Sequence, residues 1–153
     1  MAAASDLATA TPTAATVPAT TEATGVAGTT KPVRVAQLVY LRPECLEEYK
    51  RCHAAVWPDV LAQIRDSGIR DYSIFLTPVP RPTLFATFKY VGTDWDADMA
   101  CMGANERVRA WWALTDRMQE SAVPGAKGSA AATDDDAVPP WWWRAEEVFY
   151  YEG

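Results

Sequence analysis

The sequence predicts one α+β domain with the element order β-α-β-β-α-β, and three observations lead to that prediction. Four segments are rich in β-branched and aromatic residues, and two others carry apolar residues at helical spacing. The chain of 153 residues is 49% hydrophobic and 22% charged, which suits a single globular domain with an apolar core. The connector between the second and third β segments is too short for a crossover helix, so these two should pair as a hairpin.

The first half of the domain should contain a strand and a helix. Residues 33–41 are expected to form the strand, because apolar side chains fall on one side at a period of two: Val33, Val35, Val39 and Leu41. Pro43 is a favourable first helical residue, and the apolar spacing then becomes helical through Leu46, Tyr49, His53, Val56, Trp57, Val60 and Ile64. We expect one helix from Pro43 to Ser67-Gly68.

The second half should contain a hairpin, a helix and a last strand. Residues 69–76 and 83–91 are the two hairpin strands. Residues 94–119 are helical in composition, with Thr93 or Asp94 as the N-cap and Gly103 as a weak point in the middle. Residues 143–151 are aromatic and β-branched, so they should form the last strand.

The order of elements restricts the topology. Both βαβ halves must cross over right-handed, and the economical solution is a ferredoxin-like sandwich with four antiparallel strands and both helices on one face. The sheet segments carry Val, Phe, Tyr and Leu on both faces. The face without helices would then be left in water, so we expect a second copy to cover it as a homodimer, in the manner of a dimeric α/β barrel.

Two segments fall outside this pattern. Residues 1–30 hold ten Ala and nine Thr but no Lys, Arg or aromatic residue, so we expect a disordered tail. The domain proper is therefore 31–153. Within it, residues 121–140 combine small residues, three prolines and three consecutive aspartates, which predicts a long loop.

Composition excludes several classes of function. Fourteen Lys and Arg against 20 Asp and Glu give a net charge of -6, so nucleic acid is not an expected partner. Without a signal peptide or an apolar run of roughly 20 residues, the protein is expected to be soluble and cytoplasmic, with no membrane partner. Cys45, Cys52 and Cys101 include no CxxC pair, the chain has one histidine, and no phosphate-binding loop is present. We expect neither a metal nor a cofactor.

The spacing of Tyr49, His53 and Trp57 puts a phenol, an imidazole and an indole in line along the expected first helix. One interpretation is a core stripe in which His53 finds a hydrogen-bond partner. The other is an acid-base site, because histidine changes charge near neutral pH and a nearby tyrosine can donate or accept a proton.

Other aromatic residues also allow two interpretations. Trp111 and Trp112 could bind the apolar face of a sugar ring, or they could belong to the core and a partner interface. Tyr72 could point into the space between sheet and helices. Residues 141–143 are three tryptophans, which we assign to packing at the start of the last strand or to a subunit contact.

Taken in order, these motifs resemble the L-rhamnose mutarotase family over nearly all of residues 33–153. The resemblance rests on the EEYxxxH pattern ending at His53, on Trp57-Pro58, on the DYSIFL run that contains Tyr72, on Trp111-Trp112 and on the EVFY run near the C-terminus.

The resemblance implies a ferredoxin-like homodimer that interconverts the α and β anomers of a 6-deoxyhexose, L-rhamnose in the first place, without a cofactor. His53 falls on the family's acid-base position, and Tyr49, Tyr72, Trp111 and Trp112 fall on its sugar-binding positions. Three alternatives stay open: an L-fucose mutarotase, a non-catalytic dimeric barrel that binds a small ligand, and a cofactor-independent monooxygenase of similar architecture.

Overall fold

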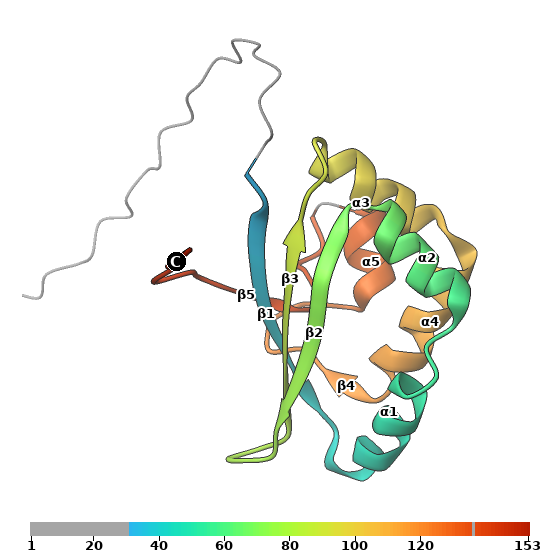
Figure 1. Ribbon diagram of the computed structural model, residues 1–153. Coiled ribbons are helices and arrows are strands. Elements are labelled where there is room, and N and C mark those ends of the chain that lie inside the picture. The colour runs from blue at the N-terminus through green and yellow to red at the C-terminus, as the bar shows by residue number, and fades with distance from the viewer. Residues whose placement is uncertain (1–30, 136) are drawn as a thin grey trace, which may run out of the picture.

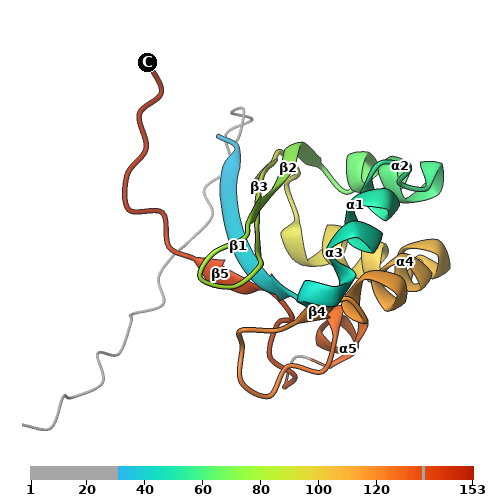
Figure 2. The same cartoon turned by 90° about the horizontal axis from the view of Figure 1, so that it is seen from below.

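The computed structural model describes residues 31–135 and 137–153, and it shows a curved antiparallel sheet with all helices packed against one face (Figures 1 and 2). The predicted disordered tail, residues 1–30, lies outside the described residues. The predicted α+β class, with helices on one face of an antiparallel sheet, is confirmed.

Strands and helices alternate along the chain. In chain order they are β1 (Val33–Leu41), the 3-10 turn η1 (Pro43–Cys45), α1 (Leu46–His53), α2 (Pro58–Asp66), β2 (Ile69–Thr77), β3 (Thr83–Tyr90), α3 (Trp95–Ala104), α4 (Glu106–Asp116), β4 (Gln119–Glu120), α5 (Ser129–Asp134) and β5 (Trp143–Ala145).

The sheet has the order β2-β3-β1-β4, and β5 also pairs with β1. All of these pairings are antiparallel, and β2 and β3 form the predicted hairpin. The register of β1 on β3 sets Val35 opposite Phe88 and Val39 opposite Leu84, so the apolar residues of both strands share the helix-covered face. This alternation follows from the period of two that the sequence shows.

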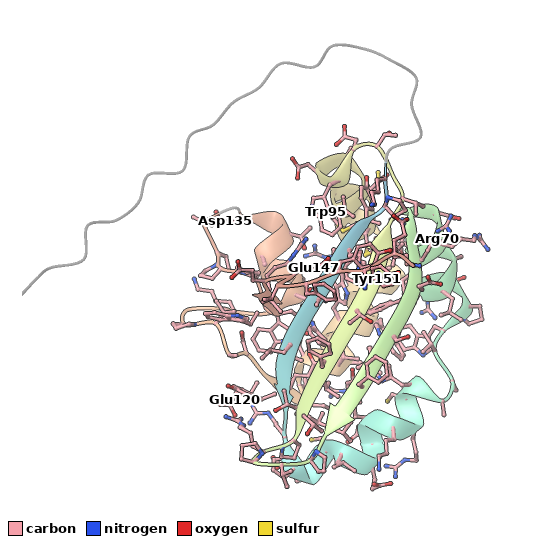
Figure 3. All side chains as sticks on the ribbon, turned by 60° about the vertical axis from the view of Figure 1, so that its left-hand side comes forward. Arg70, Trp95, Glu120, Asp135, Glu147 and Tyr151 are labelled. Carbon is pink, nitrogen blue, oxygen red and sulfur yellow. The ribbon has the colours of Figure 1, made fainter. Side chains whose placement is uncertain are left out.

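The predicted last strand is wrong beyond Ala145, and β4 was not predicted at all. Both short strands use the same edge of β1: β4 pairs with its last two residues, and β5 pairs with residues 36–38. After β5 the chain continues as coil on the face away from the helices (Figure 3). Ion pairs join this coil to the start of β1 and the residues before it, from Arg34 to Glu147 (3.3 Å) and from Lys31 to Glu152 (3.0 Å). Aromatic composition alone did not reveal that this segment lacks a neighbouring strand.

The predicted first helix is two helices, so the single helix from Pro43 to Gly68 is wrong. α1 ends at His53, and α2 starts at Pro58 after a short turn. Trp57 is extended, with a ψ of 134°. Proline restricts the residue before it to extended backbone and cannot donate to a carbonyl one turn earlier, which accounts for the break.

The predicted second helix is also divided, at Asn105. This residue is extended, with a ψ of 114°, and its side chain accepts from the backbone N–H groups of Arg107 (2.9 Å) and Val108 (3.3 Å). Asn105 therefore ends α3 and caps α4. Asp94 is the N-cap of α3, as one of the two predicted choices, and its side chain accepts from the Ala97 N–H at 3.0 Å.

The predicted loop over residues 121–140 contains a helix, α5, so the expectation of a loop throughout is wrong. Asp116 at the end of α4 accepts from both the backbone N–H and the hydroxyl of Ser129, each at 2.8 Å. Gly103 in α3 lies directly against Thr133 of α5, where a Cβ would clash. The glycine that weakened the helix prediction is thus what lets α5 approach α3.

The helix-covered face of the sheet buries two separate apolar clusters. The upper cluster consists of Val35, Ile69, Phe88, Met102 and Val108. The lower cluster consists of Val39, Leu41, Tyr49, Leu84 and Met118. β1 and β3 contribute residues to both clusters, so the middle of these strands is where the two meet.

The cap at Asn105 should contribute measurably to stability. Asn105→Ala removes both capping bonds and the bond from the Asn105 amide to Gln63 (2.8 Å), so the free energy of unfolding should fall by about 1 to 2 kcal/mol. Urea unfolding measures this change. Asn105→Ser keeps a capping oxygen and is the matched control; an equal loss in both variants would contradict the capping role.

Candidate active site

The candidate site is built around His53, the last residue of α1. Its Nδ1 lies 3.0 Å from the backbone carbonyl oxygen of Tyr49. A carbonyl oxygen can only accept, so the neutral ring carries its proton on Nδ1 and donates it to Tyr49. The other ring nitrogen, Nε2, then has a free lone pair and can accept a proton.

Aromatic rings surround this imidazole. The ring of Tyr49 stacks on it at 4.0 Å between centroids with 26° between planes, and Trp111 meets it edge-on at 5.3 Å. His53 is half-buried, and the burial lowers its pKa from 6.5, while the bond to the Tyr49 carbonyl acts in the opposite sense. At neutral pH the histidine is therefore a neutral base.

Trp57 belongs to the same aromatic cluster, although it does not lie on the helix of Tyr49 and His53 as predicted. It lies outside α1, so the line of three side chains on one helix is wrong for its third member. Its ring nevertheless packs edge-on against Trp111 at 5.3 Å, and the guanidinium of Arg107 lies 4.6 Å above it. Asp59 pairs with Arg107 at 3.3 Å and helps to hold that arrangement.

Tyr72 is turned toward the helices by an irregularity in β2. The register on β3 shifts between Arg70 and Ser73, so that two residues of β2 occupy the space opposite one residue of β3. Asp71 adopts the left-handed conformation with φ of 50°, and its carboxylate pairs with Lys89 at 2.6 Å. This bulge moves Tyr72 to the helix-covered face, where its ring meets Phe88 edge-on at 5.5 Å.

The two tyrosines hold their protons. Although 39% of Tyr72 is exposed, burial of its phenol raises its pKa to about 12. Tyr49 is only 5% exposed, and burial together with the nearby Tyr72 phenol raises its pKa, against a lowering hydrogen bond from Gln119. Both hydroxyls are therefore neutral hydrogen-bond donors at physiological pH.

The neighbouring tryptophans of α4 diverge. Trp111 is 7% exposed and faces His53 and Trp57, whereas Trp112 is half-buried against the upper apolar cluster. Adjacent helical residues point about 100° apart, which explains why the two rings contact different neighbours. Trp112 makes no ring contact with His53 in the described structure.

The site thus lies where the upper and lower clusters meet. Tyr49 belongs to the lower cluster, and Tyr72 contacts Phe88 of the upper one. Gln37 is placed on the same face of β1 between Val35 and Val39, opposite the small residue Ala86. A neutral base and two phenols thus lie beside apolar residues on the helix-covered side of the sheet, a composition suited to hydroxyl-rich ligands with an apolar ring face.

Sequence analysis missed three residues of this region. Gln37 lies in an apolar strand, Gln119 ends the predicted second helix, and Trp141 is predicted only to pack at the start of the last strand or to form a subunit contact. The indole N–H of Trp141 donates to Gln119 at 2.9 Å. Only the rule that a buried amide needs partners could have directed attention to Gln119, and the sequence gives no indication of its burial.

A cavity of about 530 Å³ on the other side of the sheet does not coincide with this site. Its lining includes Asp71, Phe85, Lys89 and Glu147. None of the five predicted site residues lines that cavity.

Within residues 31–135 and 137–153, no three side chains of the His, Cys, Asp or Glu type are grouped so as to hold a metal ion. None of the helices in those ranges is long and apolar enough to cross a membrane.

Fold and site together define a ferredoxin-like α+β protein with a neutral histidine between the sheet and its helices. A model of the family described as L-rhamnose mutarotase matches residues 34–151. The chain therefore belongs to the L-rhamnose mutarotase family, a family of isomerases, as the resemblance in the sequence predicted.

Individual relatives agree with this assignment. An L-rhamnose mutarotase of Verminephrobacter eiseniae is 39% identical over 80 residues, covering 52% of this chain and 72% of that protein. One of Burkholderia ambifaria is 33% identical over 92 residues, covering 60% and 85%. The crystal structure of an L-rhamnose mutarotase from Formosa agariphila superposes with a TM-score of 0.56 at 28% identity, over 78% of this chain and 99% of that one.

The pKa of His53 can be measured directly, because the chain has a single histidine whose ring protons need no assignment. NMR titration of the folded protein should give a pKa below 6.5, and the same chain unfolded in urea should titrate near 6.5. Because the pKa of His53 is lower in the folded protein, the contribution of the neutral histidine to the free energy of unfolding is fully present above pH 6.5. That contribution is lost as the pH falls through the folded pKa. A folded pKa above the unfolded one would contradict burial as the dominant effect.

Proposed function

We propose that this member of the family interconverts the α and β anomers of L-rhamnose, with His53 as the acid-base group. The single observation that carries the proposal is the state of that histidine: neutral, with Nδ1 engaged by the Tyr49 carbonyl and Nε2 left as an acceptor among aromatic rings. The family match and the names of the relatives support the choice of reaction.

The chemistry requires only proton transfers. Nε2 of His53 takes the proton of the anomeric hydroxyl, the bond between the anomeric carbon and the ring oxygen breaks, and the imidazolium so formed passes that proton to the ring oxygen. The open-chain aldehyde rotates about the bond next to the carbonyl and closes on its other face. During closure Nε2 takes the proton of the attacking hydroxyl and the imidazolium gives it to the former carbonyl oxygen, so neither protons nor electrons are gained or lost.

The surrounding side chains bind and orient the sugar in this proposal. Tyr49 and Tyr72 keep their protons because burial raises the pKa of both, so they donate hydrogen bonds rather than exchange protons. Trp111 and Trp112 supply aromatic faces for the apolar side of the ring. Each role is a proposal for this chain. It transfers the family's residue roles to side chains on the helix-covered side of the sheet.

The identity of the sugar rests on the relatives' names, and L-fucose is the nearest alternative because it is also a 6-deoxyhexose. NMR saturation transfer between anomeric protons over a panel of aldoses tests the choice. L-rhamnose should exchange fastest, and exchange at the spontaneous rate for every sugar would instead favour a non-catalytic binding protein. The cytoplasmic location expected from the sequence also remains a proposal.

A homodimer through the helix-free face is the second part of the proposal. Phe75 is 58% exposed and Phe85 38% exposed on that face, and the coil after β5 leaves Val148 91% and Phe149 83% exposed. Figure 3 looks onto this side of the sheet, with Glu147 in front of the strands. So many large apolar side chains in water are typical of a surface that another chain covers, and we propose that a second copy covers it.

Removal of the imidazole should abolish most of the catalysis. His53→Asn keeps a polar side chain of smaller size, and the rate of anomer exchange should fall by a factor of about 10² to 10⁴ relative to the wild type, after subtraction of the spontaneous rate in the same buffer. Circular dichroism and urea unfolding serve as controls for the fold. A folded His53→Asn protein whose rate of anomer exchange lies within a few-fold of the wild-type rate would contradict this mechanism.

Sugar contacts should be separable from proton transfer. Tyr72→Phe removes only a hydroxyl and Trp112→Ala removes a ring, so each should weaken L-rhamnose binding by about 1 to 3 kcal/mol. Isothermal titration measures the loss, and Phe75→Leu on the other face of β2 is the control for Tyr72→Phe. Unchanged affinity in both site variants would return these residues to a purely packing role.

The dimer should persist on dilution. An interface that buries a whole sheet face commonly exceeds roughly 2,000 Å², so analytical ultracentrifugation at submicromolar protein should show no monomer. Phe85→Asp places a charge on the helix-free face and should shift the equilibrium toward monomer. A wild-type protein that sediments as a stable monomer would overturn this part of the proposal.

A further inference from the structure

Asp71 and Lys89 form an ion pair next to Tyr72, on the opposite face of the sheet from the candidate site. The Asp71 carboxylate lies 2.6 Å from Nζ of Lys89, and 68% and 42% of the two side chains are exposed. Both residues line the cavity on the helix-free side, whereas Tyr72 packs edge-on against Phe88 of the upper apolar cluster. The mechanism above gives neither member of the pair a role.

The register of β2 on β3 requires one extra residue beside this pair. Ile69 pairs with Tyr90 and Ile74 with Ala86, so five steps along β2 match four steps along β3. Ile69 belongs to the upper apolar cluster and Ile74 packs against the lower one, which holds both parts of the strand with these side chains toward the helices. The bulge between them therefore cannot be lost, and only its place along β2 is open.

The position of the extra residue decides the direction of Tyr72. Asp71 takes the left-handed conformation, with φ of 50°, and Tyr72 follows it onto the helix-covered face. Aspartate is one of the few residues besides glycine that tolerate this conformation, because its short polar side chain can bond locally. If the extra residue stood one position later, the alternation of the strand would turn the Tyr72 ring toward the helix-free face.

The charges around Lys89 favour its pairing with Asp71. Lys89 stands opposite Arg34 on β1 and opposite Arg70 on β2, so three cations form a row across the sheet. Arg34 pairs with Glu147 at 3.3 Å, and the Arg70 guanidinium donates to two backbone carbonyls. The ammonium of Lys89 lowers the pKa of the Asp71 carboxyl, which is ionised at neutral pH. Asp71 thus supplies the anion that offsets the repulsion on Lys89.

We propose that Asp71 and Lys89 are positioning residues for the sugar site: their ion pair fixes the bulge at Asp71 and so directs the Tyr72 phenol toward the sugar. This inference rests on the proposed function, because it takes Tyr72 as a sugar-binding residue. The pair acts through Tyr72 from the other face of the sheet, without contact with the sugar.

The experiment measures the Kd for L-rhamnose by isothermal titration in wild type, Lys89→Met, Tyr72→Phe and the double variant. Lys89→Met keeps an unbranched side chain and removes its charge. We expect binding to weaken about two- to fivefold, the range of an exposed ion pair, with no further loss when Lys89→Met is added to Tyr72→Phe. KM should rise while kcat stays near the wild-type value, because the pair affects binding and not proton transfer.

A second readout follows the Tyr72 ring itself and needs no sugar. The ring centroids of Tyr72 and Phe88 are 5.5 Å apart, so their protons should give a nuclear Overhauser cross-peak. Asp71→Val disfavours the left-handed backbone, so the cross-peak should weaken and the affinity should fall about tenfold. Asp71→Asn tolerates that backbone and keeps an acceptor for Lys89, so it should retain the cross-peak. If Asp71→Val fails to fold, Lys89→Met carries both readouts.

Lys89→Arg and Glu147→Gln are the matched controls. Lys89→Arg keeps the cation and should bind L-rhamnose as the wild type does. Glu147→Gln removes the ion pair with Arg34 on the same face of the sheet, away from β2. It should leave the Kd unchanged, which separates the Asp71 pair from a general effect of charge on that face. Sedimentation of each variant shows whether the oligomeric state is the same.

Each outcome decides the inference. A loss of affinity in Lys89→Met that disappears in the Tyr72→Phe background and is restored by Lys89→Arg supports it. An unchanged Kd, an equal loss in both backgrounds, or a full cross-peak in folded Asp71→Val overturns the positioning role, while wild-type catalysis leaves the proposed function standing. A wild type that neither binds L-rhamnose nor accelerates its anomer exchange overturns the proposed function, and the cross-peaks still decide whether the ion pair places Tyr72.

Discussion

The one-sided burial of a curved sheet is the constraint on which the rest of this structure depends. β1 and β3 pair along almost their whole length and present Val35, Phe88, Val39 and Leu84 to the helices. The burial of these side chains is the main favourable contribution to folding. The helices cover only that face, and the candidate site lies on it, whereas the other face keeps Phe75 and Phe85 exposed.

Tyr49 determines the state of His53 in two ways. The Tyr49 carbonyl selects the tautomer of His53, and the Tyr49 ring stacks on the imidazole. One residue of α1 therefore contacts the histidine of the candidate site through both its backbone and its ring. Burial lowers the pKa of His53 and keeps the ring neutral, whereas the bond to the Tyr49 carbonyl fixes the tautomer and leaves Nε2 open.

Breaks in regular structure place most of the other site residues. Pro58 ends one helix before the next and lets Trp57 turn back toward Trp111. The bulge at Asp71 moves Tyr72 by one position, from the helix-free face to the helix-covered one. Since a strand alternates its side chains, one inserted residue is enough to decide whether this phenol belongs to the site.

Much of the fold could be predicted from the sequence, because local patterns determine it. The strand at 33–41, the hairpin and the cap at Asp94 follow from periodicity, a short connector and a side-chain acceptor. The sequence motifs also identified the family, which the family model confirms over residues 34–151. What local patterns missed were the breaks at Trp57 and Asn105, where an apolar helical spacing continues across the ends of two helices.

The sequence by itself thus determined the class of fold, the strand pairing of the hairpin and the family, since each depends on residues close together in the chain. Only the tertiary structure decided which side chains meet: His53 with Trp111, Gln119 with Trp141, and Tyr72 with Phe88. These contacts join residues of separate elements, and the burial that makes their hydrogen bonds matter exists only after the sheet and helices have packed.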